Sequence, residues 1–278
     1  MEIQNLANNI EKKSDGIYYS KSNSSISYPE EGNENCMQIE EDSFWFKHRN
    51  NVIYESVKLH SKESVFFDIG GGNGFVSKKM QNEGLKVVLV EPGNNGAINA
   101  KKRGVNTIVC STLENAGFEN SCIDSVGLFD VVEHIEDDIK FLKEINKFVK
   151  ENGYLYITVP AYKNLWSKED IDAGHYRRYT TKLLKKRIEE AGFEVIYVSY
   201  LFSLLPIPIF FFRTIPSFFG LNKNSDDLNK YKKEHNAKKG IFSKLIEKIW
   251  IWELNRVKRF KKIFMGSSCF AIARKKTI

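Results

Sequence analysis

The feature that most constrains the fold is an apolar run that ends in a glycine-rich turn. Residues 65–69 read Val-Phe-Phe-Asp-Ile, and Gly70, Gly72 and Gly74 follow. A short apolar run of this kind is typical of a buried parallel strand, and glycine has no Cβ to keep a ligand away from the backbone. A second apolar run ends at Glu91, 17 residues after Gly74. The first βα turn of a doubly wound sheet binds nucleosides in this way.

The spacing of the glycines bears on which nucleoside cofactor is bound. A dinucleotide fingerprint reads G-x-G-x-x-G and places a pyrophosphate at the helix N-terminus, whereas here Asp68 precedes glycines at every second position. An acid beside the turn repels a pyrophosphate but suits a cofactor that carries an ammonium and a sulfonium group. The spacing therefore argues against a nicotinamide dinucleotide, although a nicotinamide-dependent oxidoreductase remains the first alternative.

This acid–glycine–acid set resembles motif I of the class I S-adenosylmethionine-dependent methyltransferases. The resemblance implies that Asp68 and the three glycines shape the methionine side of the cofactor, S-adenosylmethionine, and that Glu91 accepts both ribose hydroxyls. Further cofactor contacts are expected from Arg49, aimed at the methionine carboxylate, from Thr112 and Leu113, beside the adenine, and from Phe129 and Asp130, at the end of the fourth strand. A tight turn in some other α/β protein is the alternative.

Residues 64–200 alternate between strand-like and helix-like segments, the signature of a parallel sheet with helical crossovers. Strands are predicted near 64–69, 86–91, 106–110, 124–130, 153–159 and 194–200, and helices near 74–83, 95–103, 137–150 and 180–191. The resemblance implies a seventh, antiparallel strand between strands five and six, which residues 267–274 match. We therefore expect an α/β fold with a Rossmann-like, seven-stranded, mostly parallel sheet, helices on both faces and an antiparallel last strand.

The composition divides the chain into three parts. Residues 1–40 are rich in Ser, Asn and Glu, and a helix is predicted over 41–59, so residues 1–60 are expected to form an N-terminal cap with a disordered or loose start. Residues 61–200 and 267–278 are expected to form the cofactor-binding core. Residues 201–266 are a hydrophobic and basic insertion between strands six and seven.

The insertion has an apolar part and a basic part. No charge occurs over 195–212, a run of 18 residues that reaches the lower length for a membrane span, but Pro206 and Pro208 are expected to interrupt a helix there. Apolar residues then recur at helical spacing over 241–264, with Lys and Arg opposite. We expect a hydrophobic lid or a contact with an anionic membrane, with plain packing on the body as the alternative.

A candidate catalytic group follows the fourth strand, at the sheet edge where open α/β proteins bind ligands. The segment 128–138 contains Glu133 and His134 and resembles the equivalent motif of small-molecule methyltransferases, including the quinone-type O-methyltransferases. His134 could take a proton from an acceptor hydroxyl because the pKa of histidine lies near neutrality; orienting the next helix is an equal alternative. Two adjacent residues are too few for a metal site, so no metal is expected.

The loop after the fifth strand, 160–180, is rich in aromatic, acidic and basic residues, as functional surface loops often are. Its Trp-x(5)-Asp-x-x-His-x-Arg-Arg-Tyr pattern resembles a bacterial subgroup of type 11/12 methyltransferases. His175 is the second catalytic candidate, and the substrate-binding candidates are Tyr162, Trp166, Asp172, Arg177 and Tyr179. The alternative is structural: Arg177 and Arg178 would pair with acids, and Thr180 would cap the next helix.

Charge and cysteine content limit the partners. Residues 222–278 hold 16 Lys and Arg against 5 Asp and Glu, within a chain of net charge +7, but they contain no recognisable nucleic-acid-binding module, so nucleic acid is not an expected partner. Cysteines 36, 110, 122 and 269 lack disulfide or metal spacing, which fits a reducing compartment, and the first residues do not read as a signal peptide. We expect a cytoplasmic protein that can contact the inner face of the membrane.

The sequence thus predicts methyl transfer from S-adenosylmethionine to a small-molecule, sugar or lipid-linked acceptor, on oxygen rather than nitrogen. Positioning of the two reactants would supply most of the rate. The second alternative is a membrane-associated binding module that keeps the fold without catalysis. The sequence does not predict an oligomeric state.

Overall fold

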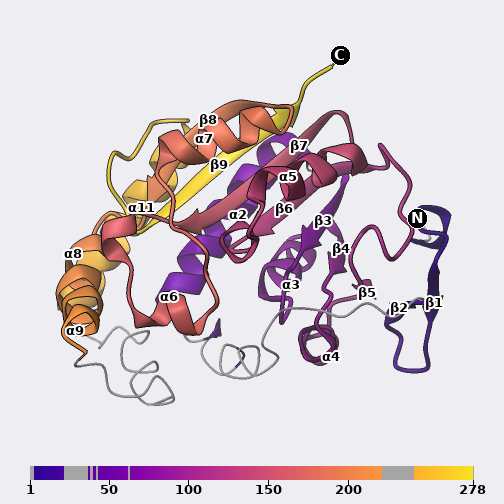
Figure 1. Ribbon diagram of the computed structural model, residues 1–278, viewed down its shortest axis with the longest axis horizontal. Helices are drawn as coiled ribbons and strands as arrows, with labels where there is room; N and C mark the ends of the chain where they lie inside the picture. The colour runs from indigo at the N-terminus through magenta and orange to yellow at the C-terminus, as the bar shows by residue number, and fades with distance from the viewer. Residues whose placement is uncertain are drawn as a thin grey trace.

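One nine-stranded sheet organises the molecule. The computed structural model describes residues 3–21, 37, 40, 41, 43–61, 63–220 and 241–277. In this part of the chain the strand order is β1-β2-β5-β4-β3-β6-β7-β9-β8 (Figure 1). The strands are β1 Ile10–Lys12, β2 Tyr18–Ser20, β3 Val65–Ile69, β4 Lys86–Val90, β5 Ile108–Cys110, β6 Ile123–Phe129, β7 Val149–Pro160, β8 Phe193–Leu201 and β9 Ser268–Lys275.

The expected mostly parallel sheet is confirmed. Strands β5, β4, β3, β6 and β7 pair in parallel, and β9 pairs antiparallel with both β7 and β8. The antiparallel last strand therefore lies between the fifth and sixth predicted strands, as the resemblance implied.

The expected count of seven strands is wrong, because an N-terminal hairpin adds two more. β1 pairs antiparallel with β2, and β2 pairs in parallel with β5, where Tyr18 lies opposite Val109. The hairpin buries Ile10 and Ile17 against the sheet. Strands of three residues are too short for alternation to be readable, although the Asp-Gly pair at 15–16 is a hairpin signal.

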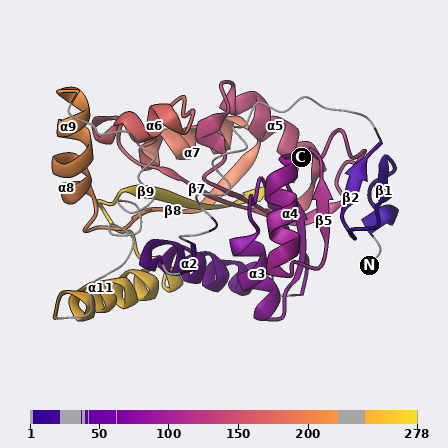
Figure 2. The same ribbon diagram turned by 90° about the horizontal axis from the view of Figure 1, so that it is seen from below.

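Helices cover both faces of the sheet because its strands alternate apolar side chains to each side. Phe66 packs on the face that carries α2, α3 and α11, and Phe67 packs on the face that carries α5 and α7 (Figure 2). The helices are α2 Phe44–Ser61, α3 Phe75–Asn82, α4 Asn94–Arg103, α5 Asp138–Phe148, α6 Lys168–Asp172, α7 Thr181–Glu190 and α11 Ile241–Lys258, with 3₁₀ turns η1 Ile3–Asn5, η2 Val132–His134 and η3 Lys163–Leu165. Thr180 Oγ1 accepts the Leu183 N–H at 3.1 Å, so this helix cap is confirmed.

The apolar part of the insertion forms a helix rather than a broken segment. α8 Pro206–Ile209, the π-helical η4 Phe210–Thr214 and α9 Ile215–Phe218 follow one another directly. The expectation that the two prolines interrupt a helix is wrong, because Pro206 and Pro208 lie in the first turn, where N–H groups need no helical partner. In the described part of the chain no helix has the length and apolarity needed to cross a membrane. Residues 221–240 of the insertion lie outside the described residues.

A buried carboxylate fastens the insertion to the body. Glu253 of α11 is fully buried and accepts hydrogen bonds from the N–H groups of Phe202 (3.0 Å) and Ser203 (2.6 Å) at the end of β8. His48 Nε2 of α2 lies 3.1 Å from the same carboxylate, and Trp250 stacks on the His48 ring with centroids 5.2 Å apart. Burial raises the pKa of Glu253, but the hydrogen bonds from His48 and Ser203 outweigh it, and the net pKa is lowered.

Replacing this carboxylate is expected to destabilise the fold. Glu253→Ala leaves two backbone donors and one hydroxyl buried without an acceptor, which should cost about 3–5 kcal/mol in the free energy of unfolding. Urea unfolding followed by circular dichroism measures this. Because the pKa of Glu253 is lowered, its contribution is present above its ordinary pKa and is lost as the pH falls through the lowered value, so the gap between variant and wild type should close in acid.

Glu247→Ala, on an exposed position of the same helix, is the matched control and should change stability by no more than about 0.5 kcal/mol. Equal stability of the Glu253 and Glu247 variants would show that the buried carboxylate does not hold α11 in place.

Candidate functional site

The glycine loop after β3 has a backbone that only glycine adopts easily. Gly70, Gly72 and Gly74 have φ values of 67°, 52° and 71°, in the left-handed region. At Gly74 a Cβ would lie 2.8 Å from the Ala100 Cβ of α4. Gly74 therefore serves the close packing of α3 on α4, while Gly70 and Gly72 form the turn itself.

Glu91 joins this loop to the turn after β4. Its Oε2 accepts the Gly72 N–H at 2.8 Å, and its Oε1 accepts the Gly93 N–H at 2.7 Å. The side chain is buried, and burial raises its pKa to about 6 against the lowering effect of these two bonds. The carboxylate is thus held in one orientation at the carboxyl end of the sheet.

Asp68, at the end of β3, is a second buried acid. Ser77 Oγ donates to Asp68 Oδ2 at 2.7 Å, but Asp68 Oδ1 has no hydrogen-bond partner among the described residues. Burial raises the pKa of Asp68 to about 6, although Ser77 and the charge of Arg49 lower it. A buried carboxylate oxygen without a hydrogen-bond donor is costly. An ammonium group of a ligand would supply the missing donor to Asp68 Oδ1.

Arg49 and Asp130 meet beside Asp68. Arg49 reaches from α2 to hydrogen-bond the Asp130 carboxylate, and Thr158 Oγ1 donates to the same carboxylate at 3.2 Å. Arg49 Nε is buried and has no partner within the described part of the chain. The unpaired donor Arg49 Nε matches the carboxylate of an amino acid, and the unpaired acceptor Asp68 Oδ1 matches its ammonium group. Phe129 is buried against Phe66 and contributes packing beneath this region.

A cleft of about 710 Å³ lies next to the glycine loop. Its walls come from the ends of β3, β4 and β5 and from α5, and they include Gly70, Pro92, Thr112, Leu113 and Phe141. The cleft is of the size used by small-molecule ligands. The structure therefore brings Thr112 and Leu113 into the same cleft as Gly70 of the glycine loop.

His134, in the turn after β6, meets His175, in the loop between β7 and α7. Their ring centroids are 4.7 Å apart in an edge-to-face arrangement. Burial and the neighbouring His175 lower the pKa of His134 to about 4. Glu133, buried beside them, has its pKa raised well above the usual range by burial and by the charge of Asp130. Ligand atoms of Glu133, His134 and His175 all lie within 4.8 Å of one another.

Asp170, which the sequence pattern did not single out, organises the loop that carries His175. Its carboxylate lies 2.8 Å from His175 Nδ1 and accepts from Arg178 Nε at 2.7 Å and from the Ser167 N–H at 2.9 Å. Burial raises the pKa of Asp170, but the bonds from His175 and Arg178 prevail and lower it to about 2. The Ser-x-x-Asp capping box at 167–170 is the sequence pattern that could have drawn attention to Asp170.

Asp172 lies on the outside of α6. It is exposed, and Lys168 Nζ lies 2.5 Å from its Oδ1. The structure therefore does not bring Asp172 to the histidine pair.

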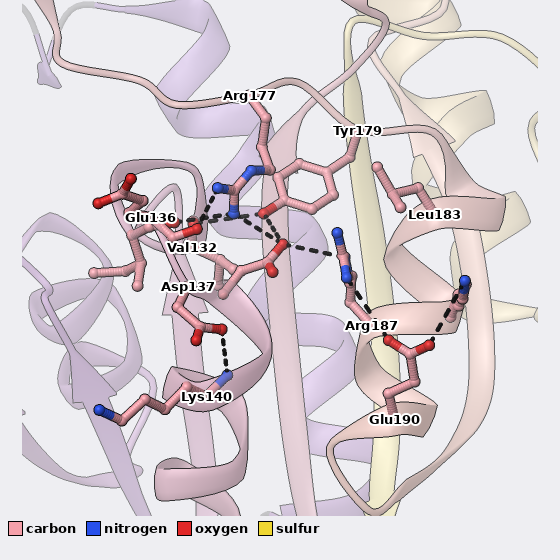
Figure 3. A network of polar contacts seen from close by, with 12 residues as sticks. Val132, Glu136, Asp137, Lys140, Arg177, Tyr179, Leu183, Arg187 and Glu190 are labelled. Atoms are coloured by element: carbon pink, nitrogen blue, oxygen red, sulfur yellow. Dashed lines mark hydrogen bonds and ion pairs between the residues drawn. The ribbon is translucent and has the colours of Figure 1, made fainter.

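Arg177 and Tyr179 hold the loop against α5 (Figure 3). Tyr179 is fully buried, and its hydroxyl donates to Asp138 Oδ2 at 2.9 Å. Arg177 Nη1 lies 3.0 Å from the same oxygen and donates to the Ile135 carbonyl at 3.0 Å. Burial and the negative charge of Asp138 raise the pKa of Tyr179. Both side chains are engaged in contacts within the protein, and Arg177 pairs with an acid as the structural alternative expected.

Tyr162 and Trp166 lie at the start of the loop and are half-buried. Tyr162 stacks on Tyr200 of β8 with centroids 4.8 Å apart. The η3 turn between Tyr162 and Trp166 contacts η4 of the insertion. The insertion therefore reaches the same loop as His175.

Comparison with known proteins gives a family match. Residues 48–198 match the family described as methyltransferase domain. A probable S-adenosylmethionine-dependent methyltransferase of Mycobacterium tuberculosis is 20% identical over 174 residues, covering 62% of this chain and 63% of that protein. A ubiquinone biosynthesis O-methyltransferase of Vibrio campbellii is 25% identical over 121 residues, 40% of this chain and 52% of that protein. The matched region thus spans less than two thirds of the length of these relatives.

A solved structure shares the fold. Phosphoethanolamine N-methyltransferase 2 of Haemonchus contortus, in complex with S-adenosyl-L-methionine, aligns with a TM-score of 0.54 and 18% identity over 94% of this chain and 62% of that chain. At this identity the likeness concerns the fold alone. It agrees with the expected Rossmann-like sheet.

Glu91→Ala should weaken binding of S-adenosylmethionine by about ten- to a hundredfold, because a charged acceptor of two hydroxyl donors contributes about 1.5–3 kcal/mol. Isothermal titration calorimetry measures the affinity. Glu119→Ala, an exposed acid outside the cleft, is the control and should bind normally.

The pH dependence of the affinity for S-adenosylmethionine distinguishes the charge of the Glu91 carboxylate from its shape. Because burial raises the pKa of Glu91 to about 6, one unit below that value only about a tenth of the carboxylate is ionised, and wild-type affinity should fall about tenfold or more. Unchanged affinity in Glu91→Ala, or a flat wild-type profile from neutral pH into mild acid, would exclude Glu91 as the ribose acceptor.

Proposed function

The chain belongs to the methyltransferase domain family, and we propose that it transfers the methyl group of S-adenosylmethionine to a hydroxyl of a small-molecule, sugar or lipid-linked acceptor. The expected family and cofactor are confirmed by the family match and by relatives that are named for S-adenosylmethionine. The acceptor and the choice of oxygen are our proposal. The family match disfavours the nicotinamide-dependent alternative.

The observation that carries the proposal is the pair of open polar atoms beside the glycine loop. Asp68 Oδ1 and Arg49 Nε are buried without partners in the described part of the chain, and they complement the ammonium and the carboxylate of a methionine moiety. We assign the ribose hydroxyls to the buried Glu91 carboxylate and the adenine to the 710 Å³ cleft with Thr112 and Leu113. The residues present therefore fit S-adenosylmethionine in each of its three parts.

The acceptor site is proposed on the histidine side of β6, between His134, His175, Tyr162 and Trp166. When bound, S-adenosylmethionine supplies an electrophilic methyl group, so that the acceptor oxygen forms a C–O bond while the C–S bond breaks and its electron pair stays on sulfur. Asp170 accepts from His175 Nδ1, which leaves Nε2 as the nitrogen that faces an acceptor proton. An acceptor hydroxyl held there becomes more nucleophilic as it gives up its proton.

Oxygen is favoured over nitrogen by two observations. The Vibrio campbellii relative is named as an O-methyltransferase, and a histidine backed by a carboxylate suits a hydroxyl, which must lose its proton, better than a neutral amine, which need not. The Haemonchus contortus structure is named for an amine acceptor, so transfer to nitrogen is the competing outcome.

Loss of His175 should lower turnover about 10²–10⁴-fold while the affinity for S-adenosylmethionine holds. His175→Ala is compared with wild type by transfer of label from methyl-labelled S-adenosylmethionine to an extract of small molecules and lipids, with mass spectrometry of the product. His134→Ala tests the second histidine in the same way.

His60→Ala is the matched control, because His60 lies on α2, outside the two segments that carry His134 and His175. Label on an amine nitrogen would refute the choice of oxygen. Cofactor binding without any label transfer would favour the binding-module alternative, and normal turnover in both site variants would mean that positioning alone drives the reaction.

We further propose that the insertion contacts an anionic membrane or a lipid-linked acceptor. The exposed fractions of Phe212, Phe218 and Phe219 are 74%, 84% and 67%, which is unusual for aromatic side chains. Arg213 lies between Phe212 and Phe218 in the chain. Helix α11, which carries the exposed Lys244 and Lys248, lies at the same end of the molecule as α8 and α9, on the left in Figures 1 and 2. An apolar surface flanked by cations matches the interface of anionic lipids.

Wild-type protein should co-sediment with vesicles that contain anionic phospholipid and be released by high salt, because each Lys or Arg near such a surface contributes about 1 kcal/mol. Phe212→Ser with Phe218→Ser should reduce binding about tenfold or more. Leu59→Ser, an exposed apolar position on α2, should bind as wild type does. Equal sedimentation with uncharged vesicles, or none with either, would leave these aromatics with a structural role only.

A further inference from the structure

Two segments far apart in sequence bring three metal-ligating side chains together. Glu133 and His134 belong to η2 after β6, and His175 belongs to the loop before α7. One ligand atom from each lies within 4.8 Å of the other two. The Tyr176 N–H donates to the Glu133 carbonyl at 2.8 Å, so the backbone fixes the two segments to each other.

The Glu133 carboxylate in this cluster is buried and lacks one of its hydrogen-bond donors. The residue is 1% exposed, and its Oε2 has no hydrogen-bond partner among the described residues. The nearby cations are engaged elsewhere, Arg49 with Asp130 and Arg178 with Asp170. A buried carboxylate oxygen without a partner is costly unless a cation or a donor reaches it.

His175 is oriented as a ligand would be. Its Nδ1 lies 2.8 Å from Asp170 Oδ1, and Arg178 Nε lies 2.7 Å from the same oxygen. An ionised Asp170 only accepts, so Nδ1 carries the proton and Nε2 keeps its lone pair. Metal-binding histidines commonly donate their other ring N–H to a carboxylate in this way.

We propose that Glu133, His134 and His175 bind one divalent transition-metal ion, which holds the acceptor oxygen. The inference deepens the proposed function and rests on it for the role of the ion. Two imidazole nitrogens and one carboxylate suit Zn²⁺, Co²⁺, Mn²⁺ or Fe²⁺ better than Mg²⁺ or Ca²⁺, which prefer oxygen ligands. Bonds of about 2.0–2.2 Å place ligand atoms about 3–4 Å from one another, so separations within 4.8 Å need a closure of no more than about 2 Å.

An ion held by three protein ligands keeps positions open for substrate. A hydroxyl bound there loses its proton more readily, as metal-bound water does. The proton passes to solvent, and the oxygen stays on the ion ready to attack the methyl carbon. His175 then acts through the ion rather than by a direct hydrogen bond to the acceptor.

Cobalt binding tests the site independently of activity. Full-length protein is stripped with a chelator and titrated with Co²⁺, whose visible absorption reports nitrogen ligation, and bound metal is counted by mass spectrometry. Wild type should bind one ion per chain, and Glu133→Gln and His175→Gln should each weaken binding at least tenfold. Glu136→Gln and His60→Gln, an exposed acid and a histidine outside the cluster, are the matched controls and should bind as wild type does.

Circular dichroism and affinity for S-adenosylmethionine establish that each variant is folded. Co²⁺ binding that is absent in wild type, or equal in wild type and both cluster variants, would overturn the site. Binding with the expected losses but methyl transfer that persists in excess chelator would overturn the role of the ion in catalysis. Binding with the expected losses and no methyl transfer under any condition would refute the proposed function and leave the metal site standing.

Discussion

The cofactor side of the molecule depends on one buried carboxylate that serves two loops at once. Glu91 accepts the N–H of Gly72 from the turn after β3 and the N–H of Gly93 from the turn after β4. Neither turn has a side-chain partner that could replace it in this role among the described contacts. The same carboxylate keeps further lone pairs, and we assign the ribose hydroxyls of the cofactor to them.

Buried charge is concentrated along the carboxyl edge of the sheet, and each charge is only partly compensated. Asp68 and Glu133 each have an oxygen without a partner in the described residues, and Arg49 has an open Nε. The stability lost by burying such groups is recovered when a ligand supplies the missing partners, which is how preorganised sites gain affinity. The apolar layers on both faces of the sheet provide the rigidity that this arrangement needs.

The sequence predicted what depends on local pattern and missed what depends on tertiary contact. The strands β3 and β4, the glycine turn and the acid after each strand are readable because their signals are contiguous. The sequence pattern singled out Asp172 rather than Asp170; both lie in the short helix α6, and only folding turns Asp170 inward to His175. The meeting of Glu253 with the end of β8 likewise joins residues that no spacing connects.

The position of β9 in the sheet affects how the chain folds during synthesis. Among the strands that the structure describes, β8 has β9 as its only neighbour in the sheet, and β9 also covers the free side of β7. Parallel strands β3 to β7 come from one continuous stretch and can associate as soon as they leave the ribosome, but β7 stays an open edge until residues 268–275 arrive. The Ser267 carbonyl beside β9 also accepts the Ala161 N–H at the start of the histidine loop. A nascent chain therefore forms the strands around the glycine loop first, and it carries an exposed strand edge, open to aggregation and to chaperones, until residues 268–275 have been synthesised.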